Sequence, residues 1–188
     1  GFTGSAGFCA ALENVAGVFI DGRYRTQVKA QVADVFTPVP WPEVSLSEWL
    51  IRQLPNGGRI GFDPWLHTVG QLPELKNALK GSGIELVQTA NLVDRIWVDQ
   101  PDPPMKPVKS HPIEFSGESS ADKCARLAKA LRKAGHSAAT ITLPDSIMWL
   151  LNIRGADIDR NPVAHCFAIL HDDARIDLFI AAVKLNEM

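Results

Sequence analysis

The chain has 188 residues, of which 46% are hydrophobic and 21% charged, and a formal net charge of −2 at pH 7. These values are ordinary for a globular protein with a buried core, and the missing basic excess argues against a general nucleic-acid binder. Its apolar runs are far shorter than the roughly 20 residues that cross a bilayer, so no membrane association is expected. The first residues do not have the pattern of a secretory signal.

The three cysteines are an odd number at wide spacing, without a CxxC pair. Neither a disulfide framework nor a structural zinc site is therefore expected. Cys9, Cys124 and Cys166 all lie in apolar sequence, which predicts small buried side chains in a reducing cytoplasm. The five tryptophans lie mostly at helical apolar positions or helix ends, which favours packing in the core or between domains.

The first half of the chain predicts alternating strands and helices. Residues 8–12 and 17–21 look like paired strands, and residues 23–35 carry apolar side chains at helical spacing. A second helix begins at Ser45, because Ser45 and Glu48 form a capping box in which each side chain accepts from the other residue's backbone N–H. The remaining predicted elements are a strand at 59–62, a helical turn opened by Asp63 and Pro64, a helix at 72–79 and a strand at 84–87.

A proline-rich segment separates this half from the next. Residues 100–112 contain five of the 13 prolines. Proline fixes φ and removes a backbone donor, so this segment favours an extended linker. We therefore expect a first domain at residues 1–99 and a second at 113–188.

In the second half, Ser119 or Ser120 is expected to cap a helix that ends at Gly135. A strand at 138–143, a buried helix at 145–151 and a hairpin of 165–171 with 175–180 follow. Five basic residues of the first of these helices are expected to form a solvated face, with a docking surface for an acidic partner as the alternative. They are Lys123, Arg126, Lys129, Arg132 and Lys133.

The two halves look related to each other. Residues 167–180 align without gaps with residues 7–20, and both read strand, acidic turn, strand ending in Phe-Ile. On this alignment the first domain lacks an opening helix–strand–helix, and the second lacks everything after its hairpin. This pattern is typical of a fragment of a longer protein.

No catalytic centre is complete in this sequence. None of the five histidines has HxxxH or HExxH spacing, and His165 and His171 lie too far apart along a strand to share a metal. The Gly1–Gly7 segment lacks the lysine of a P-loop and the GxSxG spacing that would make Ser5 a nucleophile. Asp157 and Asp159 fall in a loop, where they would bond to the backbone. We expect no catalytic, cofactor-binding or metal-binding residue.

Motifs along the whole chain resemble the N-terminal region of the three-domain Xaa-Pro aminopeptidases. Those that resemble its first domain are Gly1–Gly7, Phe19–Tyr24 with Gln27, Gly61–Pro64 and Asn91–Trp97. Those that resemble its second domain are Gly117–Ser119, Asp145–Asp157 and Asn161–Pro162.

The resemblance implies an α/β fold of two creatinase N-terminal-like domains, each a mixed sheet flanked by helices and both incomplete. In this family a pita-bread catalytic domain follows and binds two divalent metals, usually manganese, through two aspartates, a histidine and two glutamates. The metals activate a water that attacks the bond between an N-terminal residue and proline. None of these ligands maps onto this chain, so its residues look architectural.

The resemblance also implies a cytoplasmic homodimer that acts on peptides with proline second, with the parent's own catalytic domain as a partner of this chain. Asp21, Arg23 and Arg154 are candidates for ion pairs at domain or subunit contacts. Two alternatives stay open. One is the leading region of a prolidase or creatinase, which usually carries a single such domain, and the other is a free-standing α/β interaction module.

Overall fold

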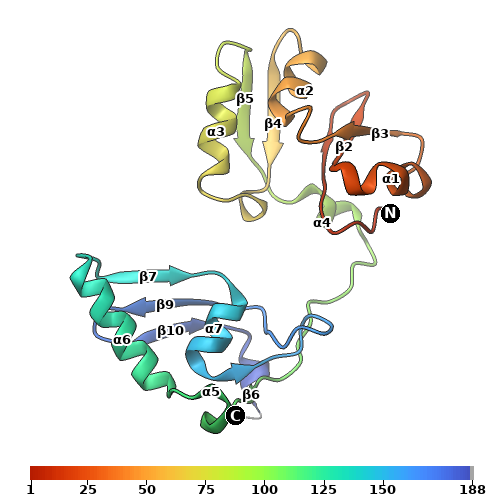
Figure 1. The fold of residues 1–188 in the computed structure, drawn as a ribbon. Helices are drawn as coiled ribbons and strands as arrows, with labels where there is room; N and C mark the ends of the chain where they lie inside the picture. The colour runs from red at the N-terminus through yellow and green to blue at the C-terminus, as the bar shows by residue number, and fades with distance from the viewer. Residues whose placement is uncertain (187–188) are drawn as a thin grey trace. The chain divides into compact units, whose positions relative to one another are not determined.

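The computed structural model describes residues 1–186 (Figure 1). The chain divides into two compact units, Gly1–Gln100 (unit 1) and Pro101–Met188 (unit 2). Both units combine strands with helices, so the predicted α/β architecture is confirmed. Among the described residues, no helix has the length and apolar character needed to cross a membrane.

The sheet at the start of unit 1 has three strands in the order β1-β2-β3. β1 (Phe8–Ala11) and β2 (Ala16–Ile20) form the predicted antiparallel hairpin, in which Phe8 lies opposite Phe19. β3 (Phe36–Pro40) pairs in parallel with the other edge of β2 and places Val39 beside Phe19. Every residue of β2 is buried, as expected for a central strand.

The connection from β2 to β3 is helical over a shorter range than predicted. A 3₁₀ turn, η1 (Gly22–Tyr24), leads into α1 (Arg25–Gln31), which ends at Val32. The sequence pattern predicts helix up to Val35, but Val35 is exposed and residues 32–35 lead the chain into β3. Pairing with β2 therefore prevails over the local helical periodicity.

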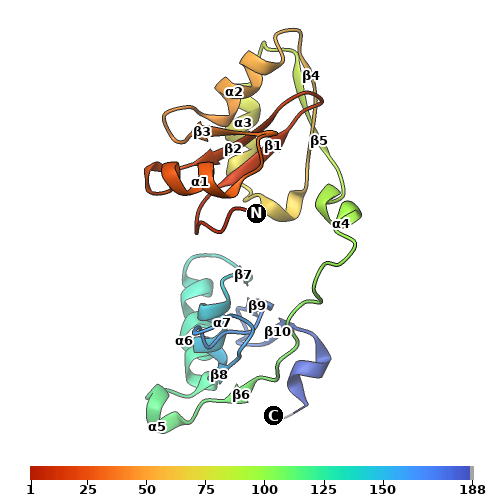
Figure 2. The same ribbon diagram turned by 90° about the vertical axis from the view of Figure 1, so that its right-hand side faces the viewer.

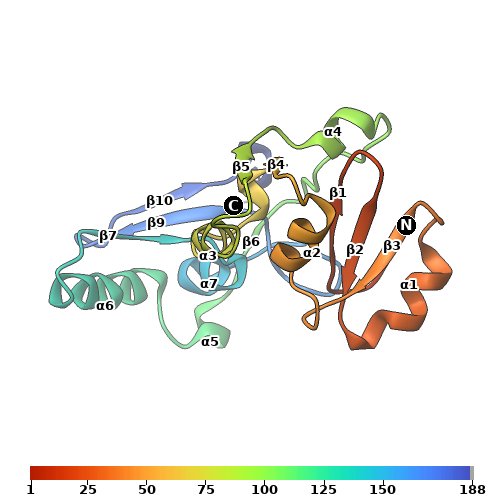
Figure 3. The ribbon, with the colours of Figure 1, turned by 90° about the horizontal axis from the view of Figure 1, so that it is seen from above.

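Helices cover both faces of this sheet (Figure 3). On one face, Val28 of α1 packs against Val18 and Ile20. On the other, α2 (Leu46–Gln53) contributes Trp49 and Leu50 to a core with Phe19. The predicted capping box begins α2, so the sequence places this core-forming helix correctly.

The rest of unit 1 is a two-stranded parallel layer. β4 (Gly58–Phe62) pairs with β5 (Ile84–Gln88), and η2 (Pro64–Leu66) and α3 (Gln71–Ala78) connect them. Two glycines make the close approach of their loops possible. Gly57 has φ +76°, and a Cβ there would lie 2.4 Å from the carbonyl oxygen of Gly83. α4 (Leu92–Ile96) follows β5 (Figure 2).

Unit 2 is built on an antiparallel sheet in the order β10-β9-β7. Its strands are β7 (Ala138–Ile141), β9 (Phe167–His171) and β10 (Ile176–Phe179). The helices α6 (Ser120–Lys133) and α7 (Pro144–Leu151) pack on one face of this sheet (Figure 1). They bury Cys124 and Leu150 against Leu170 of β9.

Part of the proline-rich segment also packs on unit 2. β6 (Lys109–Ser110) pairs with β8 (Ile153–Arg154), and α5 (Ile113–Ser116) follows β6. Val108 is fully buried, and its N–H donates to the carbonyl of Lys184 in η3 (Ala182–Leu185) at 2.8 Å. The end of the described chain and the segment before β6 are therefore held together.

Candidate functional site

A buried polar cluster surrounds Lys123 in the first turn of α6. The Lys123 side chain is enclosed, and its Nζ donates to the carbonyl of Trp149 at 2.8 Å and to Oδ1 of Asn152 at 2.6 Å. The same ammonium lies 4.5 Å from the centroid of the Trp149 ring. The prediction that Lys123 belongs to a solvated face is wrong, because its i, i+4 relation to Leu127 places it on the packed side of α6.

This lysine fixes the C-terminal end of α7. Asn152, directly after α7, adopts a left-handed conformation with φ +52° and donates through Nδ2 to the carbonyl of Glu118 at 2.9 Å. A lysine near the last carbonyls of a helix satisfies groups that have no partner within the helix. Lys123 therefore joins α6, α7 and the segment before α6.

The rest of the basic face is exposed, as predicted. Arg126 forms an ion pair with Glu118 at 2.8 Å, and its hydrogen bond lowers the pKa of the Glu118 carboxyl. Lys129 and Lys133 are exposed, and the guanidinium of Arg132 donates to the carbonyl of Asp172.

The second buried polar group is the ion pair of Asp157 with Lys184. Oδ2 of Asp157 accepts from Lys184 Nζ and, at 2.7 Å, from the N–H of His165. Burial alone raises the pKa of Asp157, but the hydrogen bonds from Lys184 and His165 outweigh this effect, so the pKa lies below its ordinary value. The sequence predicts the backbone bond of Asp157, whereas no local pattern relates this residue to Lys184.

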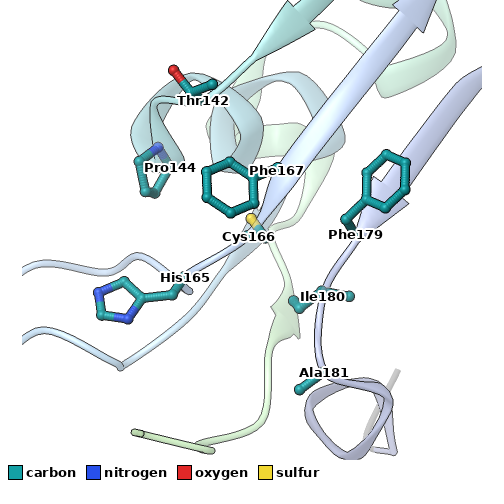
Figure 4. Close-up of a pocket in the computed structure, with 8 residues that line it drawn as sticks. All are labelled: Thr142, Pro144, His165, Cys166, Phe167, Phe179, Ile180 and Ala181. Carbon is teal, nitrogen blue, oxygen red and sulfur yellow. The ribbon is translucent and has the colours of Figure 1, made fainter. Parts of the chain in front are cut away.

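A cavity of about 410 Å³ lies where β9 begins and β10 ends (Figure 4). Its lining residues are Thr142, Pro144, His165, Cys166, Phe167, Phe179, Ile180 and Ala181. The Cys166 thiol lies 3.3 Å from the carbonyl of Ala164 as a donor, and burial raises its pKa, which favours the neutral thiol. Figure 4 shows the imidazole of His165 pointing away from the Cys166 sulfur, so the two residues do not form a nucleophile–base pair.

Asp21 and Arg23 form an ion pair with each other within a single turn of unit 1, while their expected pairing at a domain or subunit contact stays a prediction. The Arg23 N–H donates to Oδ1 of Asp21 at 2.9 Å, and Nη2 of Arg23 lies 2.7 Å from Oδ2. These contacts lower the pKa of Asp21 and raise that of Arg23. Asp21 also caps η1.

Arg154 forms no ion pair within residues 1–186, and its expected ion pair at a domain or subunit contact stays a prediction. Its Nη1 donates to the carbonyls of Ile153, at 2.8 Å, and Met148, at 3.3 Å, and no carboxylate of the described chain reaches it. Arg154 therefore supports the turn between α7 and β8.

The N-terminal glycine-rich segment bonds to α1 and to the turn before it. Ser5 shares a hydrogen bond with the hydroxyl of Tyr24, which lowers the pKa of Tyr24, and the backbone N–H of Thr3 donates to Gln31 at 2.9 Å. Cys9 is exposed, contrary to the prediction, because β1 is an edge strand of its sheet. Cys124 and Cys166 are buried as predicted.

The histidine, cysteine, aspartate and glutamate side chains of residues 1–186 form no group of three or more that could hold a metal ion. His171 instead bonds to Oδ2 of Asp177 at 2.8 Å. A dinuclear metal centre does not fit the side chains described here, and no catalytic step is assigned to them.

Comparison with known proteins shows the family to which the chain is similar. Two models, both described as creatinase/prolidase N-terminal domain, match residues 1–96 and residues 99–188. Aminopeptidase P2 of Arabidopsis thaliana is 36% identical over 99% of this chain, which spans 27% of that protein. A probable Xaa-Pro aminopeptidase P of Coccidioides posadasii is 37% identical over 100% of the chain, which spans 29% of its length.

A solved structure extends the likeness to three dimensions. X-prolyl aminopeptidase from Caenorhabditis elegans, described as a cytosolic enzyme with a di-nuclear active site, has a TM-score of 0.92 and 34% identity, covering 99% of this chain and 31% of its own. The chain thus spans about a third of the relatives that it matches. It belongs to the creatinase/prolidase N-terminal domain family and is homologous to Xaa-Pro aminopeptidases.

Proposed function

We propose that this chain is the non-catalytic N-terminal region of a metal-dependent Xaa-Pro aminopeptidase, which removes the first residue from peptides with proline second. The observation that carries the proposal is homology over 99% or more of the chain to proteins of which it spans only 27–31%. The catalytic domain and its two divalent metals, of which manganese is the proposed species, belong to the rest of the longer parent protein.

Within that parent, the two units would shape access of peptides to the active site and support a cytosolic homodimer. The buried Asp157–Lys184 ion pair and the capped helices favour a role for the units as rigid supports. Leu92, Val93 and Ile96 of α4 keep their apolar side chains exposed. Exposed apolar clusters of this kind mark contact surfaces, which supports a docking role for α4.

The test compares the 188-residue chain with the full-length parent. We expect the chain alone to hydrolyse no Xaa-Pro peptide, with or without added Mn²⁺, because it lacks the metal ligands. The parent should be active, lose activity to a chelator and recover with Mn²⁺. Metal-dependent turnover that stays with the isolated chain through several columns would contradict the proposal.

Two alternative functions predict different results in the same experiment. A parent of prolidase type would hydrolyse only Xaa-Pro dipeptides and leave longer Xaa-Pro peptides intact. A free-standing interaction module would be found in cells as a protein of this length, without any metal-dependent peptidase activity. Peptide mapping of the native protein separates the second reading from the proposal.

A further inference from the structure

The turn between α2 and β4, residues 54–57 (the 54–57 turn), contains an asparagine followed by a glycine. Asn56 is exposed, and within residues 1–186 its side-chain amide has no hydrogen-bond partner. The amide carbon Cγ of such an asparagine is open to attack by the backbone nitrogen of the next residue. Glycine has no side chain, so it leaves the approach of that nitrogen free. No other asparagine in the sequence precedes a glycine, which makes Asn56 the asparagine most prone to lose its amide group.

The fold holds the attacking nitrogen of Gly57 in a hydrogen bond. The Gly57 N–H donates to the carbonyl of Leu54 at 3.0 Å, which closes the 54–57 turn. The next N–H, that of Gly58, donates to the carbonyl of Gly83 at 3.1 Å and anchors the chain directly after the turn. Attack on Cγ requires the Gly57 nitrogen to lose its proton and rotate toward the side chain of Asn56. The 54–57 turn therefore has to open before the reaction.

A close backbone contact keeps the 54–57 turn shut. Gly57 has φ +76°, and a Cβ added there would lie 2.4 Å from the carbonyl oxygen of Gly83. The loop that carries Gly83 is itself fixed by a serine. The Ser82 hydroxyl donates to the carbonyl of Leu79 at 2.7 Å and accepts from the N–H of Ile84 at 3.2 Å. Because this loop is held, the turn opens only when the start of β4 separates locally from β5.

We propose that Asn56 is a site of spontaneous deamidation, and that the contact between Gly57 and Gly83 sets its rate. When the 54–57 turn opens, the Gly57 nitrogen loses its proton to hydroxide and bonds to Cγ of Asn56. The bond from Cγ to Nδ2 breaks, and Nδ2 takes a proton from water and leaves as ammonia. The product is a cyclic imide. Water then opens the ring at either carbonyl, which gives aspartate or isoaspartate at this position.

The pair Asp21–Gly22 shows why bonding, and not the following glycine alone, selects the site. Asp21 also precedes a glycine, but its carboxylate accepts from the backbone N–H and the guanidinium of Arg23. A carboxylate held in this way is a poor target for attack by an amide nitrogen. We therefore expect isoaspartate at Asn56 and none at Asp21.

Isoaspartate would disturb the backbone at the point of closest contact. In isoaspartate the main chain runs through the side-chain carbons and is longer by a carbon atom. The approach of Gly57 to Gly83 leaves no room even for a Cβ, so the longer chain moves the start of β4 away from β5. The Gly58 N–H then loses its bond to the carbonyl of Gly83. Aspartate, the other product, leaves the main chain unchanged.

Incubation of the folded protein at mildly alkaline pH, followed by peptide mapping with mass spectrometry, measures the reaction. The mass difference between an amide and a carboxyl group reveals deamidation, and chromatography separates the isoaspartate peptide from the aspartate peptide. We expect both products at Asn56, at a rate about tenfold below that of the protein unfolded in urea. Equal rates in the folded and unfolded protein, or no product at Asn56 in either, would overturn the proposal.

Two glycines of the same loop provide matched variants. Gly83 has φ +74° and Gly81 has φ +80°, so alanine strains the backbone alike at both positions. Only Gly83 touches the turn, since a Cβ there would lie 3.4 Å from Cα of Gly57, whereas a Cβ at Gly81 meets nothing within 4 Å. Relief of the strain at Gly83 shifts the contact. We expect deamidation about tenfold faster in Gly83→Ala and within about twofold of the wild-type rate in Gly81→Ala. Equal acceleration in both variants would contradict control by this contact.

Hydrogen exchange separates the effects of the two products. Asn56→Asp carries the new charge on an unchanged main chain and should keep the Gly58 N–H protected. In the isoaspartate fraction, purified by ion exchange, the same amide should exchange about 100-fold faster. An isoaspartate form that protects Gly58 as well as Asn56→Asp does would show that the contact with Gly83 tolerates the longer chain, and the proposed control by that contact would fall.

Discussion

Lys123 and Lys184 are both buried in unit 2, but their partners differ in charge. Lys184 faces the carboxylate of Asp157, whereas Lys123 donates to a backbone carbonyl and a side-chain amide oxygen. The sequence carries a signal for Lys123, its i, i+4 relation to Leu127, which the surrounding run of basic residues hides. It carries none for Lys184, because a contact between distant loops follows only from the fold.

Replacement of Lys123 by methionine should destabilise unit 2. The apolar stem is kept, but the carbonyl of Trp149 and Oδ1 of Asn152 lose a buried donor, which costs about 2–3 kcal/mol in the free energy of unfolding. Urea denaturation followed by circular dichroism measures the change. Lys129→Met on the exposed side of the same helix is the matched control and should stay within about 0.5 kcal/mol of the wild type. Equal losses for both variants would show that the buried contacts contribute nothing.

The Asp157–Lys184 pair predicts a dependence of stability on pH. The pKa of Asp157 in the folded state lies below its ordinary value of 3.8, so the unfolded chain binds the proton more readily. The stabilisation is therefore complete above about pH 5 and is lost as the pH falls through 3.8 toward the folded-state pKa.

Asp157→Asn tests this dependence. At neutral pH the variant should lose about 3–5 kcal/mol, because the Lys184 charge stays buried without its partner. The difference from the wild type should shrink in acid, where the wild-type carboxyl is itself protonated. Urea denaturation as a function of pH checks this, with Asp159→Asn at an exposed position as the control. A difference that does not vary with pH would exclude an electrostatic origin.

At the scale of elements, the sequence predicts best where the signal is local. The hairpin of β1 and β2 and the cap of α2 depend on neighbouring residues and are found as predicted. The sequence analysis predicts no element at β3, where Pro38 and Pro40 each remove a backbone donor. They are tolerated because β3 lies at an edge of its sheet, where a missing N–H breaks no further ladder.

The capping box of α2 offers a test of how firmly this helix is anchored. The Ser45 hydroxyl accepts from the Glu48 N–H at 3.2 Å, and a Glu48 carboxylate oxygen accepts from the Ser45 N–H at 2.9 Å. Ser45→Ala should cost about 1 kcal/mol of unit 1 stability. Thermal unfolding of the chain measures it, with Arg52→Ala at an exposed position of the same helix as the control, because alanine is a good helix former. A Ser45→Ala variant as stable as Arg52→Ala would mean that packing alone sets the start of α2.

For the whole molecule, sequence motifs predict the α/β class and the likeness to Xaa-Pro aminopeptidases, and both are confirmed. The motifs could not show the cavity beside Phe179, because the sequence of residues 167–180 predicts only an ordinary pair of strands. Whether an apolar strand residue is covered depends on elements that follow elsewhere in the chain. Phe19 of β2 is fully buried, whereas Phe179 of β10 is 54% exposed, and this difference becomes visible only in the structure.

The pairing of β9 with β10 encloses one residue more than that of β1 with β2, because Phe179 follows its partner Phe167 by 12 positions and Phe19 follows Phe8 by 11. This difference matters for tracing ancestry. If the two units descend from one duplicated domain, an insertion or deletion occurred in a single copy after the duplication. Its confinement to the turn kept Phe167 opposite Phe179. A gap-free self-alignment instead matches Ala168 with Phe8, although Ala168 packs with α7 on one face of its sheet and Phe8 stacks on Phe19 on the other, so it compares opposite faces of a sheet. A phylogeny built on it would overstate how far the two copies have diverged.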